Sequence, residues 1–260
     1  MNNLKKIVLP LLVATTFYGL ADEIKVGGMA GKEAEILYAA QKVAKEKFNL
    51  DVEVVTFNDY IMPNLALKNK EIDVNAFQHR PYLNQMVKQH GLEFTVVGDT
   101  FVFPIGVYSK KYKDIKKLPK GAAIAIPNDP SNKGRSLILL AKTGLIELAD
   151  INNLTSSVLD ITKNENEYNI KEFDAALLPR MLEQVDAAFI NSGFAVDAGL
   201  LPSKDAILVE AKDSPYMNII VAREEDKDKE TIKKFVQAYQ SDAVKAAAEK
   251  AFKGAAVAGW

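Results

Sequence analysis

The sequence of 260 residues contains no cysteine and only two histidines. Without cysteine, the chain can form no disulfide, no thiolate nucleophile, no Cys-ligated zinc site and no iron–sulfur cluster. The two histidines, His79 and His90, lack the His-x-x-x-His spacing of a helical zinc site. We therefore expect neither a metal site nor a metal cofactor.

The chain also lacks a surplus of charge of either sign. Its 33 basic and 34 acidic residues give a formal net charge of -1, and both signs are interspersed without a basic block. Such a pattern offers no attraction for nucleic acid or an anionic membrane surface, so the expected partner is a small molecule. A chain of this length with 48% hydrophobic residues can form one large core or two modest ones, and two lobes are our first interpretation.

Long hydrophobic runs are missing except at the amino terminus. Two lysines precede the apolar run 7–17, which is too short to span a bilayer as a helix. The small residues Gly19 and Ala21 suit cleavage by signal peptidase before Asp22. We expect residues 1–21 to be a signal peptide, which implies an exported protein; the alternative is an uncleaved anchor.

Beyond residue 21 the hydrophobic pattern alternates between strands and helices. In the first block it predicts strands at 24–28, 52–57 and 71–76 and helices at 33–47, 60–68 and from Pro81 to about residue 89. This βαβαβα order favours a mainly parallel sheet with helices on its faces.

A second α/β block follows a lysine-rich stretch. The pattern predicts strands at 122–126, 158–161, 169–173 and 187–190, helices at 134–143 and 177–184, a last strand at 217–221 and one long terminal helix reaching Phe252. The fold class is therefore α/β, with two lobes joined by crossover strands near 101–109 and 217–222 and a ligand cleft between them. The predicted boundaries are 22–105 for the first part of lobe 1, 106–218 for lobe 2, and 219–260 for the return to lobe 1.

The segment 77–83 carries two aromatic residues, a histidine and a proline at one predicted strand-to-helix junction. Open α/β sheets bind ligands at the carboxyl ends of their strands, and Pro81 is suited to the start of a helix. Phe77, His79 and Tyr82 are therefore candidates for the wall of a ligand pocket. The alternative is that Phe77 and Tyr82 are ordinary core aromatics.

A turn-rich loop, 127–136, lies between a predicted strand and a predicted helix. Backbone donors and the helix dipole favour an anion at such a place, and a guanidinium matches a carboxylate in a bidentate geometry. Arg135, which the pattern places in the first helical turn, is thus a candidate carboxylate partner. The alternative is that Asn132 or Ser131 only caps the helix and that Arg135 is a solvated surface residue.

Two asparagines stand at the ends of predicted strands. Asn191 follows the apolar run 187–190, and Asn218 opens the last strand. An amide can both accept from an ammonium and donate to a carboxylate, so the two could hold an α-amino acid by its polar head together with Arg135. Asparagine is also common in turns, which is the alternative.

Seven segments in order along the chain carry a family resemblance. They are FNDYIMPNLAL from Phe57, NAFQHRPYL from Asn75, FVFPIGVYSKK from Phe101, AIPNDPSNKGRSL from Ala125, INSGFA from Ile190, SPYMNIIVARE from Ser214 and the ending KGAAVAGW. From about Ile24 to Trp260 the chain resembles the NlpA lipoprotein family of MetQ-type methionine-binding proteins.

The resemblance implies a periplasmic-binding-protein fold and the role of substrate receptor for an ABC importer of methionine. The partners would be a permease and an ATPase, with no cofactor and no catalytic residue. Separately from the resemblance, we expect a monomer. L-methionine is the expected ligand; D-methionine, a methionine dipeptide or a related amino acid are the alternatives. The resemblance assigns seven residues to the ligand site. The aromatic cage would be Tyr60, Phe77, His79 and Tyr82, the carboxylate partner would be Arg135, and the two other polar contacts would be Asn191 and Asn218.

The chain departs from the family at one point. Members are typically anchored through a lipid on a cysteine at the end of the signal, and this sequence has no cysteine. The membrane tether is therefore in doubt, and we expect a protein free in the periplasm.

Other classes of function remain as alternatives. One is an exported enzyme with His79 as a general base, although the sequence has no Gly-x-Ser-x-Gly, His-Glu-x-x-His or cysteine nucleophile. Another is a surface adhesin or antigen on the same fold.

Overall fold

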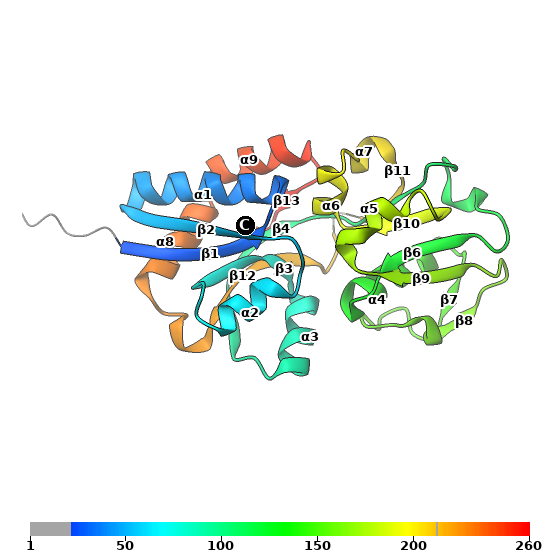
Figure 1. Ribbon diagram of the computed structural model, residues 1–260, viewed down its shortest axis with the longest axis horizontal. Coiled ribbons are helices and arrows are strands. Elements are labelled where there is room, and N and C mark those ends of the chain that lie inside the picture. Colours follow the sequence, from blue (N-terminus) through cyan, green and yellow to red (C-terminus); the bar gives the residue numbers. More distant parts are fainter. Residues whose placement is uncertain (1–21, 212) are drawn as a thin grey trace, which may run out of the picture.

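The computed structural model describes residues 22–211 and 213–260, and the expected signal peptide lies outside them. Two α/β lobes, each built around its own sheet, lie next to each other along the long axis of the molecule (Figure 1). The predicted α/β architecture with two lobes is confirmed. None of the helices in the described part is both long and apolar enough to cross a bilayer.

The first lobe contains a six-stranded sheet in the order β13-β4-β12-β3-β1-β2. Its strands are β1 (Asp22–Met29), β2 (Leu50–Phe57), β3 (Val74–His79), β4 (Phe94–Val102), β12 (Met217–Arg223) and β13 (Val257–Ala258). β1 is parallel to β2 and β3, but β12 is antiparallel to both of its neighbours, β3 and β4. The sheet is therefore mixed rather than mainly parallel, because the strand that returns from the second lobe enters it in the opposite direction.

Helices cover both faces of this sheet (Figure 1). They are α1 (Lys32–Phe48), α2 (Met62–Lys68), α3 (Arg80–His90), α8 (Glu230–Tyr239) and α9 (Asp242–Phe252). Successive side chains of β12 point to opposite faces of the sheet. Ile220 packs in the core beneath α1, α8 and α9, whereas Ile219 and Val221 pack on the side of α2 and α3. β12 therefore contributes to the packing of both helix layers.

The predicted long terminal helix is in fact two helices. Ser241 has extended backbone angles and serves as the N-cap of α9, while the side chain of Gln240 donates to the Asp99 carbonyl oxygen at 2.9 Å. This hydrogen bond to β4 fixes the backbone where α8 ends and α9 begins. The apolar sequence pattern continues across this point although the helix does not.

The second lobe contains a five-stranded sheet in the order β11-β5-β10-β6-β9. Its strands are β5 (Gly106–Tyr108), β6 (Ala123–Pro127), β9 (Asn169–Phe173), β10 (Ala187–Ile190) and β11 (Ala206–Val209), with a separate hairpin of β7 (Glu147–Leu148) and β8 (Ile161–Lys163). Its helices are α4 (Pro130–Lys142), α5 (Leu178–Met181), α6 (Ser192–Asp197) and α7 (Pro202–Asp205). Short 3₁₀ turns lie at Ile115–Lys117, Val158–Asp160, Ala175–Leu177 and, in the first lobe, Glu224–Asp226.

Two predictions for this lobe were wrong in detail. The strand expected at 158–161 is a 3₁₀ turn followed by β8, because Ser157 and Asp160 form a capping box that closes the turn. The helix expected at 177–184 is a 3₁₀ turn followed by the single helical turn of α5.

Two short connections join the lobes. β4 leads into β5 through residues 103–105, and β11 leads back towards β12, with residues 210, 211 and 213–216 described between them. The lobe boundaries 22–105, 106–218 and 219–260 stay a prediction about which parts move as units.

A row of aromatic rings runs from the carboxyl terminus towards the cleft. Trp260 lies 4.8 Å from Phe101 between ring centroids, and Phe101 lies 5.8 Å from Phe103. Phe103 also packs on Phe252, at 4.7 Å. Trp260 is partly buried and packs against the first lobe's core.

Candidate ligand-binding site

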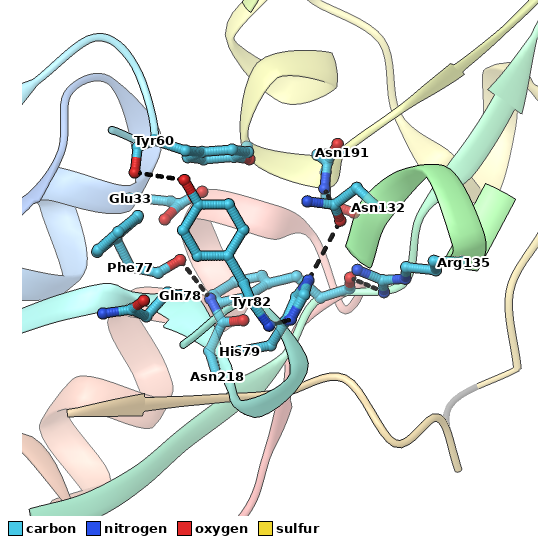
Figure 2. Close-up of a pocket in the computed structure, with 13 residues that line it drawn as sticks. Glu33, Tyr60, Phe77, Gln78, His79, Tyr82, Asn132, Arg135, Asn191 and Asn218 are labelled. Carbon is cyan, nitrogen blue, oxygen red and sulfur yellow. Dashed lines mark hydrogen bonds between the residues drawn. The ribbon is translucent and has the colours of Figure 1, made fainter. Parts of the chain in front are cut away.

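A cavity lined by residues of both lobes lies between them. All seven residues predicted for the site line it, which are Tyr60, Phe77, His79, Tyr82, Arg135, Asn191 and Asn218. Six further lining residues had not been assigned to the site, which are Glu33, Gln78, Phe103, Asn132, Ser192 and Gly193. Most of these side chains converge on one space in Figure 2.

The strand β3 carries the first group of lining residues. It runs from Val74 to His79, three residues beyond the predicted end at 76, so Phe77 and His79 lie on the strand itself and share a face. Pro81 is the second residue of α3, and His79 is the N-cap, with its Nδ1 accepting from the Tyr82 backbone N–H at 3.1 Å. The cap turns Tyr82 back towards the strand.

Three rings form an aromatic wall, which we define as Tyr60, Phe77 and Tyr82. Their centroids lie 6.0 to 6.1 Å apart, and the Tyr82 hydroxyl donates to the Tyr60 carbonyl oxygen at 2.8 Å. Phe77 and Tyr82 also pack in a small core with Met29. Both interpretations of these aromatics therefore hold, because the rings are buried and also line the cavity.

His79 is a neutral histidine of defined tautomer. Its Nδ1 accepts from Tyr82, so the proton is on Nε2, which donates to Asn132 Oδ1 at 3.2 Å. Burial, followed by the charge of Arg135, lowers the pKa of His79 to about 3. With both nitrogens engaged, the ring is a rigid part of the cavity wall.

His79 is expected to remain neutral as the pH falls from 8 to about 4. The His90→Gln variant leaves His79 as the only imidazole, and its NMR carbon-bound proton shifts should stay constant over that range. The folded pKa of about 3 lies below the ordinary value of 6.5, so the neutral ring contributes stability that is present above pH 6.5 and is lost as the pH falls towards 3. A titration midpoint near pH 6.5 in the folded protein would contradict the buried, hydrogen-bonded geometry.

Asn132 connects the two lobes at the cavity. Its Oδ1 accepts from His79 of the first lobe and, at 3.0 Å, from Asn191 Nδ2 of the second. Its Nδ2 donates to the Asp129 carboxylate at 3.0 and 3.2 Å. Asn191 is thereby oriented, and its Oδ1 is buried without a hydrogen-bond partner among the described residues.

Helix α4 begins at Pro130, four residues before the predicted start at 134. Asp129 is the N-cap, since its Oδ1 accepts from the Asn132 backbone N–H at 2.9 Å, so neither Asn132 nor Ser131 caps the helix. Arg135 consequently lies in the second turn, not the first, and the prediction that placed it at the helix start was wrong.

Arg135 is buried, with 3% of its surface exposed, so it is not a solvated surface residue. Its Nε donates to the Glu210 carboxylate at 3.0 and 3.1 Å, and its Nη2 donates to Glu210 and, at 2.9 Å, to the Phe103 carbonyl oxygen. The guanidinium also lies 4.5 Å from the ring centroid of Tyr216. Nη1 has no hydrogen bond to a described residue and is left for another acceptor.

Asn218 lies on β12 opposite His79 in the antiparallel pairing with β3. Its Nδ2 donates to the Phe77 carbonyl oxygen at 3.0 Å, which orients the amide at the cavity edge. The return strand therefore supplies a polar group directly beside the aromatic wall.

The start of α1 brings a carboxyl group to the cavity. Glu33 is the second residue of α1, and a Cβ added at Gly193 would lie only 2.1 Å from its Oε1. Next to it, the Lys32 backbone N–H donates to Asp197 of the second lobe at 2.8 Å, and Gly31, at φ 76°, has no room for a side chain beside Asp197. The turn between β1 and α1 thus contacts the second lobe.

Burial raises the pKa of Glu33 to about 8, and the nearby Asp197 carboxylate adds to the shift. Glu33 makes no hydrogen bond or ion pair within residues 22–211 and 213–260. It is the one acidic side chain among the described residues that line the cavity.

Comparison with known proteins places the chain in a family. The model of the NlpA lipoprotein family matches residues 24–260. The chain belongs to the NlpA lipoprotein family. The D-methionine-binding lipoprotein MetQ of Escherichia coli K12 is 54% identical over 241 residues, which cover 92% of this chain and 89% of the relative. The probable D-methionine-binding lipoprotein MetQ of Vibrio cholerae is 50% identical over 239 residues, covering 92% and 89%.

Solved structures of similar sequence share the fold. A crystal structure of the methionine binding protein MetQ superposes with a TM-score of 0.90 at 54% identity, covering 92% of this chain and 98% of the other. A nutrient binding protein from Burkholderia cenocepacia, solved bound to methionine, gives 0.89 at 50% identity, covering 91% and 100%. The resemblance and the two-lobed fold predicted from the sequence are confirmed, and the alternative of an enzyme is set aside because the relatives that match over most of the chain are named methionine-binding proteins.

Proposed function

We propose that the chain is the extracytoplasmic substrate-binding protein of an ABC importer and that it binds methionine in the cavity between the lobes. One observation carries the proposal, which is that a solved relative with 50% identity over 91% of this chain holds methionine. The expected partners are the permease and the ATPase of that importer, and the protein itself is expected to act as a monomer.

The chemistry of the cavity supports an amino acid with an apolar side chain. Nη1 of Arg135 has no hydrogen bond to an acceptor among the described residues, and it can donate to the ligand carboxylate. The oriented amides of Asn191 and Asn218 can bind the polar head, while the aromatic wall can contact the thioether. Sulfur–aromatic contacts contribute about 0.3–1.5 kcal/mol each, so several are needed for selectivity.

Contacts across the cleft support a mechanism of closure around the ligand. The hydrogen bonds from His79 to Asn132 and from Lys32 to Asp197 join groups on different lobes. A ligand that contacts both lobes stabilises the closed form relative to the open one, and the permease can then recognise the closed shape. In this mechanism the lobes defined by 22–105 with 219–260, and by 106–218, move as units.

The proposal is tested by isothermal titration of protein that has been unfolded, dialysed and refolded to remove bound ligand. We expect binding of L-methionine with micromolar or tighter affinity and weaker binding of leucine. D-methionine and methionine dipeptides belong in the same series, because the MetQ relatives are named for D-methionine; tighter binding of either would replace L-methionine as the ligand. The absence of binding to every methionine species would overturn the proposal.

The cellular location follows from the same role. The relatives are named lipoproteins, whereas this sequence has no cysteine to carry a lipid. We propose a protein free in the periplasm, and mass spectrometry of the exported protein would contradict this by detecting a lipid adduct.

A further inference from the structure

Helix α6 of the second lobe packs against the start of α1 in the first lobe (Figure 1). Gly193, Val196 and Asp197 are three and four positions apart on α6 and therefore share one of its faces. Val196 is buried in the apolar cluster that forms the first lobe's core, and the ring of Phe194 lies 5.1 Å from that of Tyr60, between centroids. These contacts join the lobes through protein groups alone, so they are available whether or not a ligand is bound.

Helix α1 has no capping side chain of its own. Its N-cap is Gly31, which cannot accept from the free N–H groups of the first turn. Asp197 supplies an acceptor from the other lobe, since its Oδ1 accepts from the Lys32 backbone N–H at 2.8 Å. The Lys32 ammonium pairs with Glu35, so Asp197 binds the start of the helix, where the helix dipole also favours a carboxylate.

Gly31 makes room for this cap from the second lobe. Its backbone lies at φ 76°, a conformation that residues with a side chain rarely adopt. A Cβ at this position would overlap the Asp197 carboxylate. A serine or aspartate, which are the usual N-cap residues, would therefore both strain the backbone and exclude Asp197. The start of α1 is thus shaped to receive its cap across the cleft.

We propose that Asp197 is a positioning residue for ligand binding, which caps α1 across the lobes, stabilises the closed form and thereby sets the affinity for methionine. The inference rests on the proposed function, because the apparent affinity of a two-lobed receptor depends on how much of the unliganded protein is closed. Neither Asp197 nor Lys32 is among the described residues that line the cavity. The cap therefore favours closure without touching the ligand.

The test compares Asp197→Ala with the matched control Asp205→Ala. Asp205 accepts from the Leu201 backbone N–H, also at 2.8 Å, but both groups belong to the second lobe. Because Asp197 is exposed, its removal leaves no buried charge and the variant should fold. Loss of a capping carboxylate shifts an equilibrium by about 3- to 10-fold. We expect Asp197→Ala to bind methionine more weakly by about that factor and the control to bind it as wild type does.

Closure itself is measured as a distance between two spin labels. Since the chain has no cysteine, Lys42→Cys on α1 and Lys171→Cys on β9 introduce one exposed labelling site in each lobe. Without methionine, we expect wild type to populate the short distance of the closed form and Asp197→Ala to shift towards a longer one. Saturating methionine should bring both proteins to the same short distance.

Asp197→Asn separates capping from a general loss of structure. Asparagine keeps a side-chain oxygen and is about as good a cap as aspartate, so this variant should recover most of the affinity and of the closed population. Wild-type affinity and distances in Asp197→Ala would overturn the inference, and so would weaker binding with unchanged distances. Failure of wild type to bind any methionine species would instead overturn the proposed function, while the distances without ligand would still test the cap.

Discussion

Replacing Arg135 with alanine is expected to abolish most methionine binding and also to destabilise the fold. The guanidinium is 3% exposed and its Glu210 partner 11% exposed, so truncation leaves a buried carboxylate without compensation. Loss of one partner of a buried ion pair costs about 3–5 kcal/mol. Loss of the proposed contact to the ligand carboxylate adds about 2–5 kcal/mol in binding free energy.

Two measurements separate these effects. Chemical denaturation of the unliganded variant gives the loss of folding free energy, and titration under conditions where the variant is folded gives the loss of affinity. Lys133→Ala is the matched control, because Lys133 lies two residues earlier on α4 and makes a more exposed ion pair with Glu172 at 2.6 Å. That change should cost about 1 kcal/mol or less and leave binding intact.

The Arg135→Lys variant adds a further distinction. Lysine keeps the charge near Glu210 but cannot reach Glu210, Phe103 and the ligand at once, because it lacks the planar fork. We expect partial recovery of stability with little recovery of affinity. Wild-type affinity in folded Arg135→Ala would contradict the assignment of Arg135 to the ligand.

Replacing Asn132 with alanine is expected to weaken binding and stability together, although the side chain need not touch the ligand. The change leaves His79 Nε2–H and Asn191 Nδ2 without their acceptor, and it removes the two contacts that Asn132 Nδ2 makes to the Asp129 carboxylate. A buried polar group left unpaired costs about 1–3 kcal/mol. We expect a loss of stability of about 2 kcal/mol or more and a drop in methionine affinity of at least about 10-fold.

The measurements are thermal unfolding with and without methionine, together with NMR of His79. Asn69→Ala is the control, since Asn69 is exposed at the end of α2 and its side chain donates to Glu71 at the surface. A purely structural role for Asn132 would lower stability and leave the intrinsic affinity of the folded protein unchanged, which would contradict its role in orienting the cavity wall.

Local patterns explain why much of the site could be predicted. Strand β3 and its helix start are adjacent in sequence, so Phe77, His79 and Tyr82 follow from one junction. The partner of Arg135 could not be predicted in this way, because Glu210 is 75 residues away and meets it only when the two lobe connections come together.

Several predictions were wrong or incomplete because more than one residue, or more than one role, fits the same local sequence pattern. Both Asp129 and Asn132 are good N-cap residues, and Asp129 holds the position because Pro130 directly after it is already suited to the first helical turn. Glu33 resembles an acid that complements a helix dipole, and only the approach of Gly193 from the other lobe brings it into the cavity. The break at Ser241 was missed because the apolar spacing on both sides of it suits a helix.

The position of Trp260 makes the first lobe optically distinct from the second. It is the single tryptophan of the chain, and its indole N–H is buried among the rings that end the first lobe's core. Tryptophan emission during denaturation will therefore follow the first lobe alone, whereas circular dichroism follows both. Coincidence of the two curves would mean that the lobes unfold as one cooperative unit, and a separation between them would reveal an intermediate with one lobe intact.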